Sequence, residues 1–139
     1  MVATPDRIER EILIRAPLDR VWPLVAQPGW WISDGDGDRS GQVRSRDGAH
    51  EVLEDPRSGR HLFEVVAMER PTRAAYRWVK GAQHLATVVE FALTAEPDGP
   101  RLRVVERGIA SLPGDRSGYY RDNAEGWAIE LEIARRRAP

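Results

Sequence analysis

Hydrophobic and polar residues alternate along most of the chain, which is the spacing typical of half-buried β-strands. Residues 7–15 place Ile8, Ile12 and Ile14 on one face and charged residues on the other. Asp47-Gly48, a dipeptide favoured in tight hairpin turns, separates two short alternating segments. The pattern predicts seven strands: 7–15, 42–46, 49–54, 61–70, 73–80, 85–96 and 101–109.

Two short helices are predicted between the first and second strands. Residues 18–25 follow Ala16-Pro17 and carry apolar side chains at helical spacing. Pro23 removes one backbone hydrogen bond there, so this helix should be short or kinked. Residues 28–31 should form a turn or a second, single-turn helix, and the Gly- and Asp-rich residues 33–41 should form a loop.

The spacing becomes helical again from about Asp115 to Ala138. Asp115 or Ser117 can cap the start of this helix, whose length corresponds to about six turns. Its apolar residues repeat every three or four positions and form one stripe, which should face the sheet. The stripe consists of Tyr120, Ala124, Trp127, Leu131 and Ala134.

These elements predict an α+β fold in a single domain spanning 1–139. Six consecutive strands joined by short turns indicate an antiparallel sheet, and the long helix must bury its stripe on one face of it. A sheet of seven strands twists and curves. The curved sheet should therefore wrap around the C-terminal helix and leave a cavity beside it.

Composition narrows the classes of function. The chain has no cysteine, which excludes disulfides and thiol nucleophiles, and its net charge of −1 gives no electrostatic reason to expect nucleic acid as a partner. No apolar segment approaches the ~20 residues needed to span a membrane. The N-terminus lacks the apolar stretch of a secretory signal, so a cytoplasmic location is expected.

Four segments resemble a known superfamily in order along the chain. They are ILIRAPLDRVWPLV (12–25), FEVVAMERPTRAAYRW (63–78), TVVEFALTAEPDGPRLRVVERG (87–108) and NAEGWAIELEIA (123–134). The chain resembles the START-like (SRPBCC, polyketide-cyclase-like) helix-grip superfamily. Within it, the chain is most similar to the family of activator of heat-shock-protein-90 ATPase homologues. The resemblance implies a helix-grip fold with a ligand cavity.

No metal or cofactor is expected. Asp34, Asp36 and Asp38 have the spacing that opens a calcium-binding EF-hand loop, but Arg39 and Ser45 stand where that loop needs Gly and Glu. The three histidines, His50, His61 and His84, are far apart in sequence and show no zinc-ligand spacing. A Gly-x-Ser-x-Gly elbow is also missing, so a hydrolase triad has no nucleophile.

Glu106 is a carboxylate on a predicted core face, together with Leu102 and Val104. Burial of a carboxylate requires a partner or protonation. Glu106 can pair with an arginine such as Arg77, can lie at the edge of the cavity, or can contact a ligand as an acid–base group.

Aromatic side chains are typical of small-molecule cavities, and the chain has five tryptophans. Trp22 is assigned to the core, whereas Trp31, Trp78 and Trp127 are predicted to line the cavity. The predicted ligand-binding residues are Trp31, Phe63, Trp78, Phe91, Glu106, Tyr120 and Trp127.

Three functions follow from these observations. The first is binding of a small hydrophobic or amphipathic molecule, without chemistry. The second is a cyclase or aldol-type reaction with Glu106, a histidine or a tyrosine as acid–base group, although no catalytic residue is assigned. The third, which the family resemblance implies, is a co-chaperone that activates a heat-shock ATPase. The expected partners are the small molecule and, weakly, a second copy of the chain in a homodimer.

Overall fold

The computed structural model describes residues 5–80 and 85–137. Its described part contains seven strands, two α-helices and one 3-10 turn. In chain order the elements are β1 (Arg7–Leu13), α1 (Leu18–Val25), β2 (Val43–Asp47), β3 (His50–Asp55), β4 (Gly59–Glu69), β5 (Arg73–Lys80), β6 (Leu85–Thr94), β7 (Arg101–Arg107), η1 (Ile109–Ser111) and α2 (Arg116–Arg137).

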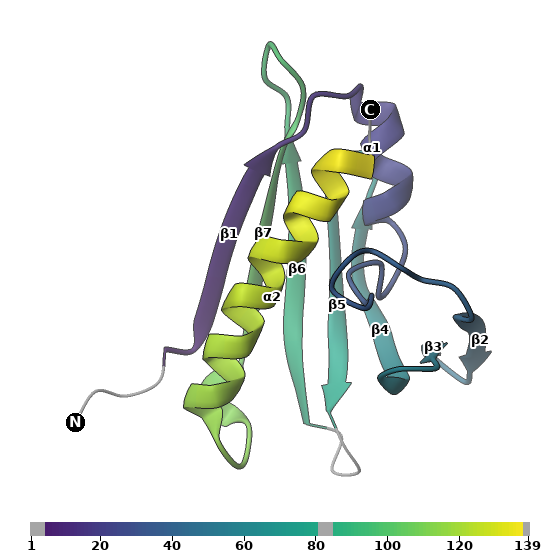
Figure 1. Ribbon diagram of the computed structural model, residues 1–139, viewed down its shortest axis with the longest axis vertical. Helices are drawn as coiled ribbons and strands as arrows, with labels where there is room; N and C mark the ends of the chain where they lie inside the picture. Colours follow the sequence, from purple (N-terminus) through teal and green to yellow (C-terminus); the bar gives the residue numbers. More distant parts are fainter. Residues whose placement is uncertain (1–4, 81–84, 138–139) are drawn as a thin grey trace.

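All seven strands belong to one antiparallel sheet, in the order β1-β7-β6-β5-β4-β3-β2. Consecutive strands from β2 to β7 are neighbours, as their short connections predict. The helix α2 crosses one face of this sheet. The helix α1 lies on the same side of the sheet, near the C-terminal end of α2 (Figure 1). The predicted α+β fold, with a long helix against an antiparallel sheet, is confirmed.

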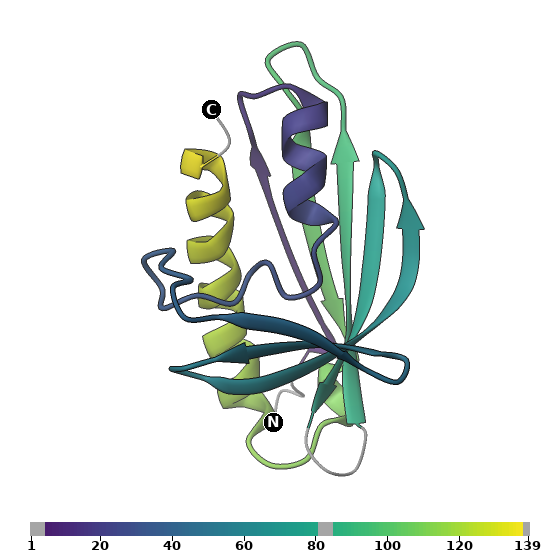
Figure 2. The ribbon, with the colours of Figure 1, turned by 90° about the vertical axis from the view of Figure 1, so that its right-hand side faces the viewer.

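The sheet is strongly twisted and curved. Seen from the side, β2 and β3 run across the direction of β6 and β7 and turn around toward α2 (Figure 2). This curvature brings the turns at the β2–β3 side of the sheet next to the middle of α2. It creates the space in which the candidate site lies.

Burial follows the predicted alternation. On β7, Leu102, Val104 and Glu106 are all 0% exposed, so the prediction that Glu106 lies on a core face is confirmed.

The helix α2 begins at Arg116, and Asp115 Oδ1 caps it by accepting a hydrogen bond from the Gly118 amide at 2.9 Å. Trp127 and Leu131 of its apolar stripe are buried against the sheet, as expected. No helix in residues 5–80 and 85–137 is long and apolar enough to cross a bilayer.

The helix α1 is short, as Pro23 in its interior predicts. Of the two alternatives predicted for residues 28–31, the structure has the turn and not the second short helix, so α1 is the one helix between β1 and β2. Gly29 adopts a left-handed conformation, with φ of +77°, which ends any helical path there. An added Cβ at Gly29 would lie 2.8 Å from the Phe63 ring, so the turn packs tightly on the core.

Candidate ligand pocket

Three tryptophans from three different elements meet beside α2. Trp31 comes from the turn after α1, Trp78 from β5 and Trp127 from α2. The ring centroid of Trp31 lies 5.4 Å from that of Trp78 and 5.4 Å from that of Trp127. These separations are typical of favourable aromatic contacts. Trp31 therefore joins the sheet to the C-terminal helix.

A pocket of about 310 Å³ opens over these rings. We call it the tryptophan pocket. Its walls come from the turn after α1, the start of β4, the end of β5 and the middle of α2. The residues that line it are Trp31, Ile32, Ser33, Gly35, Ser58, His61, Trp78, Asn123, Gly126, Trp127, Ile129 and Glu130.

The mouth of the tryptophan pocket is apolar. Trp78 is half-buried, and Ile129, on the helix side, is 40% exposed, so both present apolar surface to solvent at the pocket. Trp31 and Trp127 are almost fully buried and form the inner wall. Apolar surface at the mouth of a concave site is what a small hydrophobic ligand would cover.

Glu130 is the charged group in the wall. It is 8% exposed, and its Oε1 accepts a hydrogen bond from the Ser33 hydroxyl. Its Oε2 is buried and has no hydrogen-bond partner in the described part of the chain. Burial raises the pKa of this carboxyl group, against the opposite effects of the Ser33 hydrogen bond and of the Arg39 and Arg137 charges.

Arg39 forms a long ion pair with Glu130 but donates no hydrogen bond to it in the described part of the chain. Its NH2 group lies 3.8 Å from Glu130 Oε2. The guanidinium donates instead to the backbone carbonyls of Trp30, from Nε at 3.1 Å and NH2 at 2.6 Å, and of Gly37, from NH1 at 3.1 Å. Arg39 thus fixes the shape of the loop, and the carboxylate keeps unused capacity for accepting hydrogen bonds.

Trp31 also has an unused polar atom. Its Nε1 is buried and finds no acceptor among residues 5–80 and 85–137. Buried indole N–H groups usually find a partner. The tryptophan pocket therefore has an unpaired donor and an unpaired acceptor in residues of its wall.

Glu106 lies under the pocket and does not line it. Its carboxylate accepts hydrogen bonds from Tyr119 Oη at 2.7 Å, Asn123 Nδ2 at 3.0 Å and Trp127 Nε1 at 2.9 Å. Burial, with the negative charge of Glu106, raises the pKa of Tyr119, so its hydroxyl stays protonated and donates. The arrangement orients Trp127 and fastens α2 to β7.

Of the alternatives left open for Glu106, pairing with an arginine such as Arg77 is contradicted by the structure. Arg77 lies on β5 and its NH1 is 3.3 Å from Glu64 Oε2, on the neighbouring strand β4. The donors that reach Glu106 are neutral side chains of α2 at every fourth position. That spacing was visible in the sequence, but it does not show which carboxylate the row of donors faces.

The predicted site residues divide into two groups. Trp31, Trp78 and Trp127 line the tryptophan pocket. Phe63 and Phe91 are 0% exposed and pack behind Trp31, with ring centroids 5.3 Å from it in both cases. The structure places these two rings, Glu106 and Tyr120 outside the pocket lining, and Tyr120 packs, partly buried, against the core.

Sequence reasoning missed Glu130, Ser33 and Asn123 as wall residues. Glu130 is not among the apolar residues from which the stripe of α2 was predicted. Its position three residues after Trp127 is a signal that could have been used, because residues i and i+3 are neighbours on a helix surface.

Asp55 holds the segment that carries Trp31. Gln42 Nε2 donates both to Asp55 Oδ2 at 2.8 Å and to the Ile32 carbonyl at 2.9 Å. Hydrogen bonds from Arg57, and then from Gln42 and backbone amides, outweigh the cost of burial and hold the pKa of Asp55 far below its ordinary value.

Asp55→Asn is expected to lower the free energy of unfolding at pH 7 by about 2 kcal/mol, because charge-assisted hydrogen bonds are lost. A carboxyl group whose folded-state pKa is lowered stabilises above its unfolded pKa of ~3.9, and this stabilisation is lost as the pH falls through the folded value. The difference between variant and wild type should therefore shrink in acid. Chemical denaturation at several pH values measures it, and a difference that does not change with pH would contradict the assignment.

The candidate metal ligands do not come together in the structure. Asp34 Oδ1 accepts hydrogen bonds from the amides of Asp36 and Asp38, as in an ordinary polar loop. His50 contacts Glu64 and His61 contacts Ser58, while His84 lies outside the described residues. Across the ranges 5–80 and 85–137, no group of three or more His, Cys, Asp or Glu side chains is arranged to hold a metal ion.

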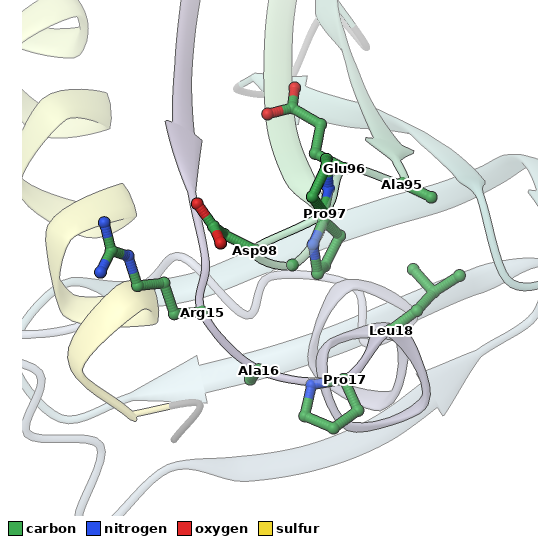
Figure 3. Close-up of a pocket in the computed structure, with 10 residues that line it drawn as sticks. Arg15, Ala16, Pro17, Leu18, Ala95, Glu96, Pro97 and Asp98 are labelled. Carbon is green, nitrogen blue, oxygen red and sulfur yellow. The ribbon is translucent and has the colours of Figure 1, made fainter.

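A second depression, of about 450 Å³, lies between the Arg15–Leu18 segment and the β6–β7 turn (Figure 3). None of its described lining residues is aromatic. Glu96 in its wall is paired with Arg101, at 2.7 Å. The turn also packs directly on the chain after β1, because an added Cβ at Gly99 would lie 2.1 Å from the Ile14 carbonyl oxygen. This depression is larger but offers less for recognition than the tryptophan pocket.

Comparison with known proteins finds solved structures that have the same fold. The sequence matches no protein-family model and no curated protein. Protein MLL2253 from Mesorhizobium loti is 23% identical, with a TM-score of 0.72 over 94% of each chain. The Aha1 dimer from Colwellia psychrerythraea is 14% identical, with a TM-score of 0.71 over 99% of this chain and 96% of that one.

A third similar structure is DynU16, a protein in the dynemicin biosynthetic locus. It is 20% identical, with a TM-score of 0.69 over 95% of this chain, which spans 46% of DynU16. Identities this low establish the fold and leave function to the site itself. The chain shares the fold of these three structures, and the helix-grip architecture predicted from its sequence is confirmed at the level of the fold.

Proposed function

We propose that the protein binds a small amphipathic molecule in the tryptophan pocket. The observation that carries the proposal is the convergence of Trp31, Trp78 and Trp127 on one concave site between sheet and helix. Ligand sites are typically apolar clefts with a few placed polar groups, and this pocket has that composition.

The size of the pocket limits the ligand. A volume of about 310 Å³ lies at the small end of the usual range for ligand sites, so the ligand should have about the size of one substituted ring. Trp31 packs on both Trp78 and Trp127, and the three indoles come from different elements, so the walls are positioned before a ligand binds. Preorganised walls reduce the entropic cost of binding.

An acid–base reaction through Glu106 has less support. The carboxylate is 0% exposed, and its oxygens already accept hydrogen bonds from three side chains of α2. A general base must reach the proton that it abstracts. A weak homodimer and a co-chaperone role stay predictions from the sequence, and the similar Aha1 structure, which is of a dimer, adds only the shared fold.

Trp78→Ala is expected to weaken binding of an amphipathic probe at least about tenfold, because it removes the half-buried wall of the pocket. The matched control is Trp22→Ala, since Trp22 is buried in the core on α1 and does not line the pocket. Saturable change of tryptophan fluorescence on titration with 2-phenylethanol measures the affinity. Both variants lose stability, so affinity is determined on the folded fraction.

Two results would count against the proposal. One is a probe that shifts neither the fluorescence nor the melting temperature of the wild type, which ligand binding must raise by mass action. The other is a loss of affinity that is as large for Trp22→Ala as for Trp78→Ala.

A further inference from the structure

The described lining of the tryptophan pocket carries a negative charge and no positive charge from lysine or arginine. Among its described lining residues, Glu130 is the one with a fixed formal charge, and neither lysine nor arginine is present. Arg39 lies outside the lining, forms a long ion pair with Glu130 at 3.8 Å and donates its hydrogen bonds to backbone carbonyls. The charge of Arg137, also outside the lining, acts on Glu130 as well. The ligand space therefore faces a carboxylate and three indoles.

Indole faces and carboxylates both attract cations. The negative face of a tryptophan ring binds ammonium groups, best when they are desolvated, and a carboxylate adds a charge-assisted hydrogen bond. Glu130 and Trp127 are three residues apart on α2 and both line the pocket. The same wall therefore offers both kinds of contact.

Resting on the function proposed above, we infer that the pocket selects a small organic cation, an aliphatic or arylalkyl amine whose ammonium group binds Glu130 and whose apolar body lies on the three tryptophans. Oε2 of Glu130, which accepts no hydrogen bond from residues 5–80 and 85–137, provides the acceptor. The last torsion of a glutamate side chain is broad. A small rotation of the carboxylate therefore presents an oxygen to the ammonium group while Ser33 keeps the other.

The inference predicts the weakest binding for the anionic counterpart of the same ligand. A carboxylate head would lie beside Glu130 in a poorly solvated site, where like charges repel strongly. A neutral alcohol would bind with intermediate strength, because it donates a hydrogen bond without a charge. The expected order of affinity is amine, then alcohol, then carboxylate.

The test uses three probes with one apolar body: phenethylamine, 2-phenylethanol and phenylacetate. Calorimetric titration at pH 8, where the amine is protonated, should show the amine binding about tenfold tighter than the alcohol, as expected for a charge-assisted over a neutral hydrogen bond. Phenylacetate should bind weakest.

Glu130→Gln keeps the shape and the acceptor for Ser33 but removes the charge. It should reduce the amine affinity about tenfold, to within about twofold of that of the alcohol, and leave the alcohol nearly unchanged. The matched control is Glu125→Gln, which removes one charge from an exposed position of the same helix. Circular dichroism confirms that both variants are folded.

The outcomes separate this inference from the proposed function. If no probe binds the wild type, the proposed function fails. If the probes bind but the amine is not preferred, or if its preference survives Glu130→Gln, the pocket binds ligands without selecting cations and the inference is wrong. Loss of the preference in Glu130→Gln and not in Glu125→Gln supports it.

Discussion

Replacing Glu106 with leucine is expected to lower the free energy of unfolding by about 3–5 kcal/mol. The substitution removes the acceptor for Tyr119, Asn123 and Trp127, and a buried donor left without a partner costs about 1–3 kcal/mol. Asn123 is partly exposed and can form a hydrogen bond with water instead, whereas the buried Trp127 indole N–H cannot. Chemical denaturation monitored by circular dichroism measures the loss.

Glu106→Gln is the matched control and should cost only about 1–2 kcal/mol. The amide oxygen can accept from Asn123 and Trp127, which both bond to Oε1, and the amide NH₂ can donate to the Tyr119 hydroxyl oxygen. The two variants differ mainly in whether the donors keep partners. Equal losses in Leu and Gln variants would show that hydrogen bonding to Glu106 does not fasten α2 to the sheet.

Trp31→Ala should have the second large effect, lowering the free energy of unfolding by about 3–5 kcal/mol and abolishing measurable probe binding. The indole packs on Phe63, Phe91, Trp78 and Trp127, so its removal leaves a cavity between sheet and helix. The loss of binding follows because Trp31 forms the inner wall of the tryptophan pocket. Denaturation and calorimetric titration of the folded variant measure the two effects.

Trp31→Phe separates packing from recognition. It keeps an aromatic ring in the cluster but removes the unpaired Nε1 donor. Stability should therefore recover partly, and binding of 2-phenylethanol should recover with it, because apolar contact supplies most of the affinity in such pockets. If folded Trp31→Ala binds the alcohol as tightly as the wild type, Trp31 is a core residue and no part of a ligand site.

The topology of the sheet could be predicted because it depends on local patterns. Alternation over β6 and β7 fixes which side chains face the core, and the short turns make consecutive strands antiparallel neighbours. The start of α2 was predicted for the same reason, since Asp115 caps the helix within a few residues of the change in spacing.

The errors concern features that depend on distant parts of the chain. For residues 28–31 the sequence left a turn and a single-turn helix open, and the structure has the turn, with Gly29 packed on Phe63. The partner of Glu106 depends on how α2 is rotated over β7, which spacing within either element does not reveal. Periodicity groups Glu130 with the off-stripe polar residues, and it lies in the pocket wall because the loop carrying Ser33 folds over that side of the helix.

The most direct test of the pocket is to follow the five indole N–H signals by nuclear magnetic resonance during titration with phenethylamine. The account predicts saturable shifts for Trp31, Trp78 and Trp127, whose rings surround the pocket, and the smallest shift for Trp22, which lies on α1 away from the pocket lining. Shifts of Trp22 that equal or exceed those of Trp31, Trp78 and Trp127, or no saturable shift in any of these three, would contradict it.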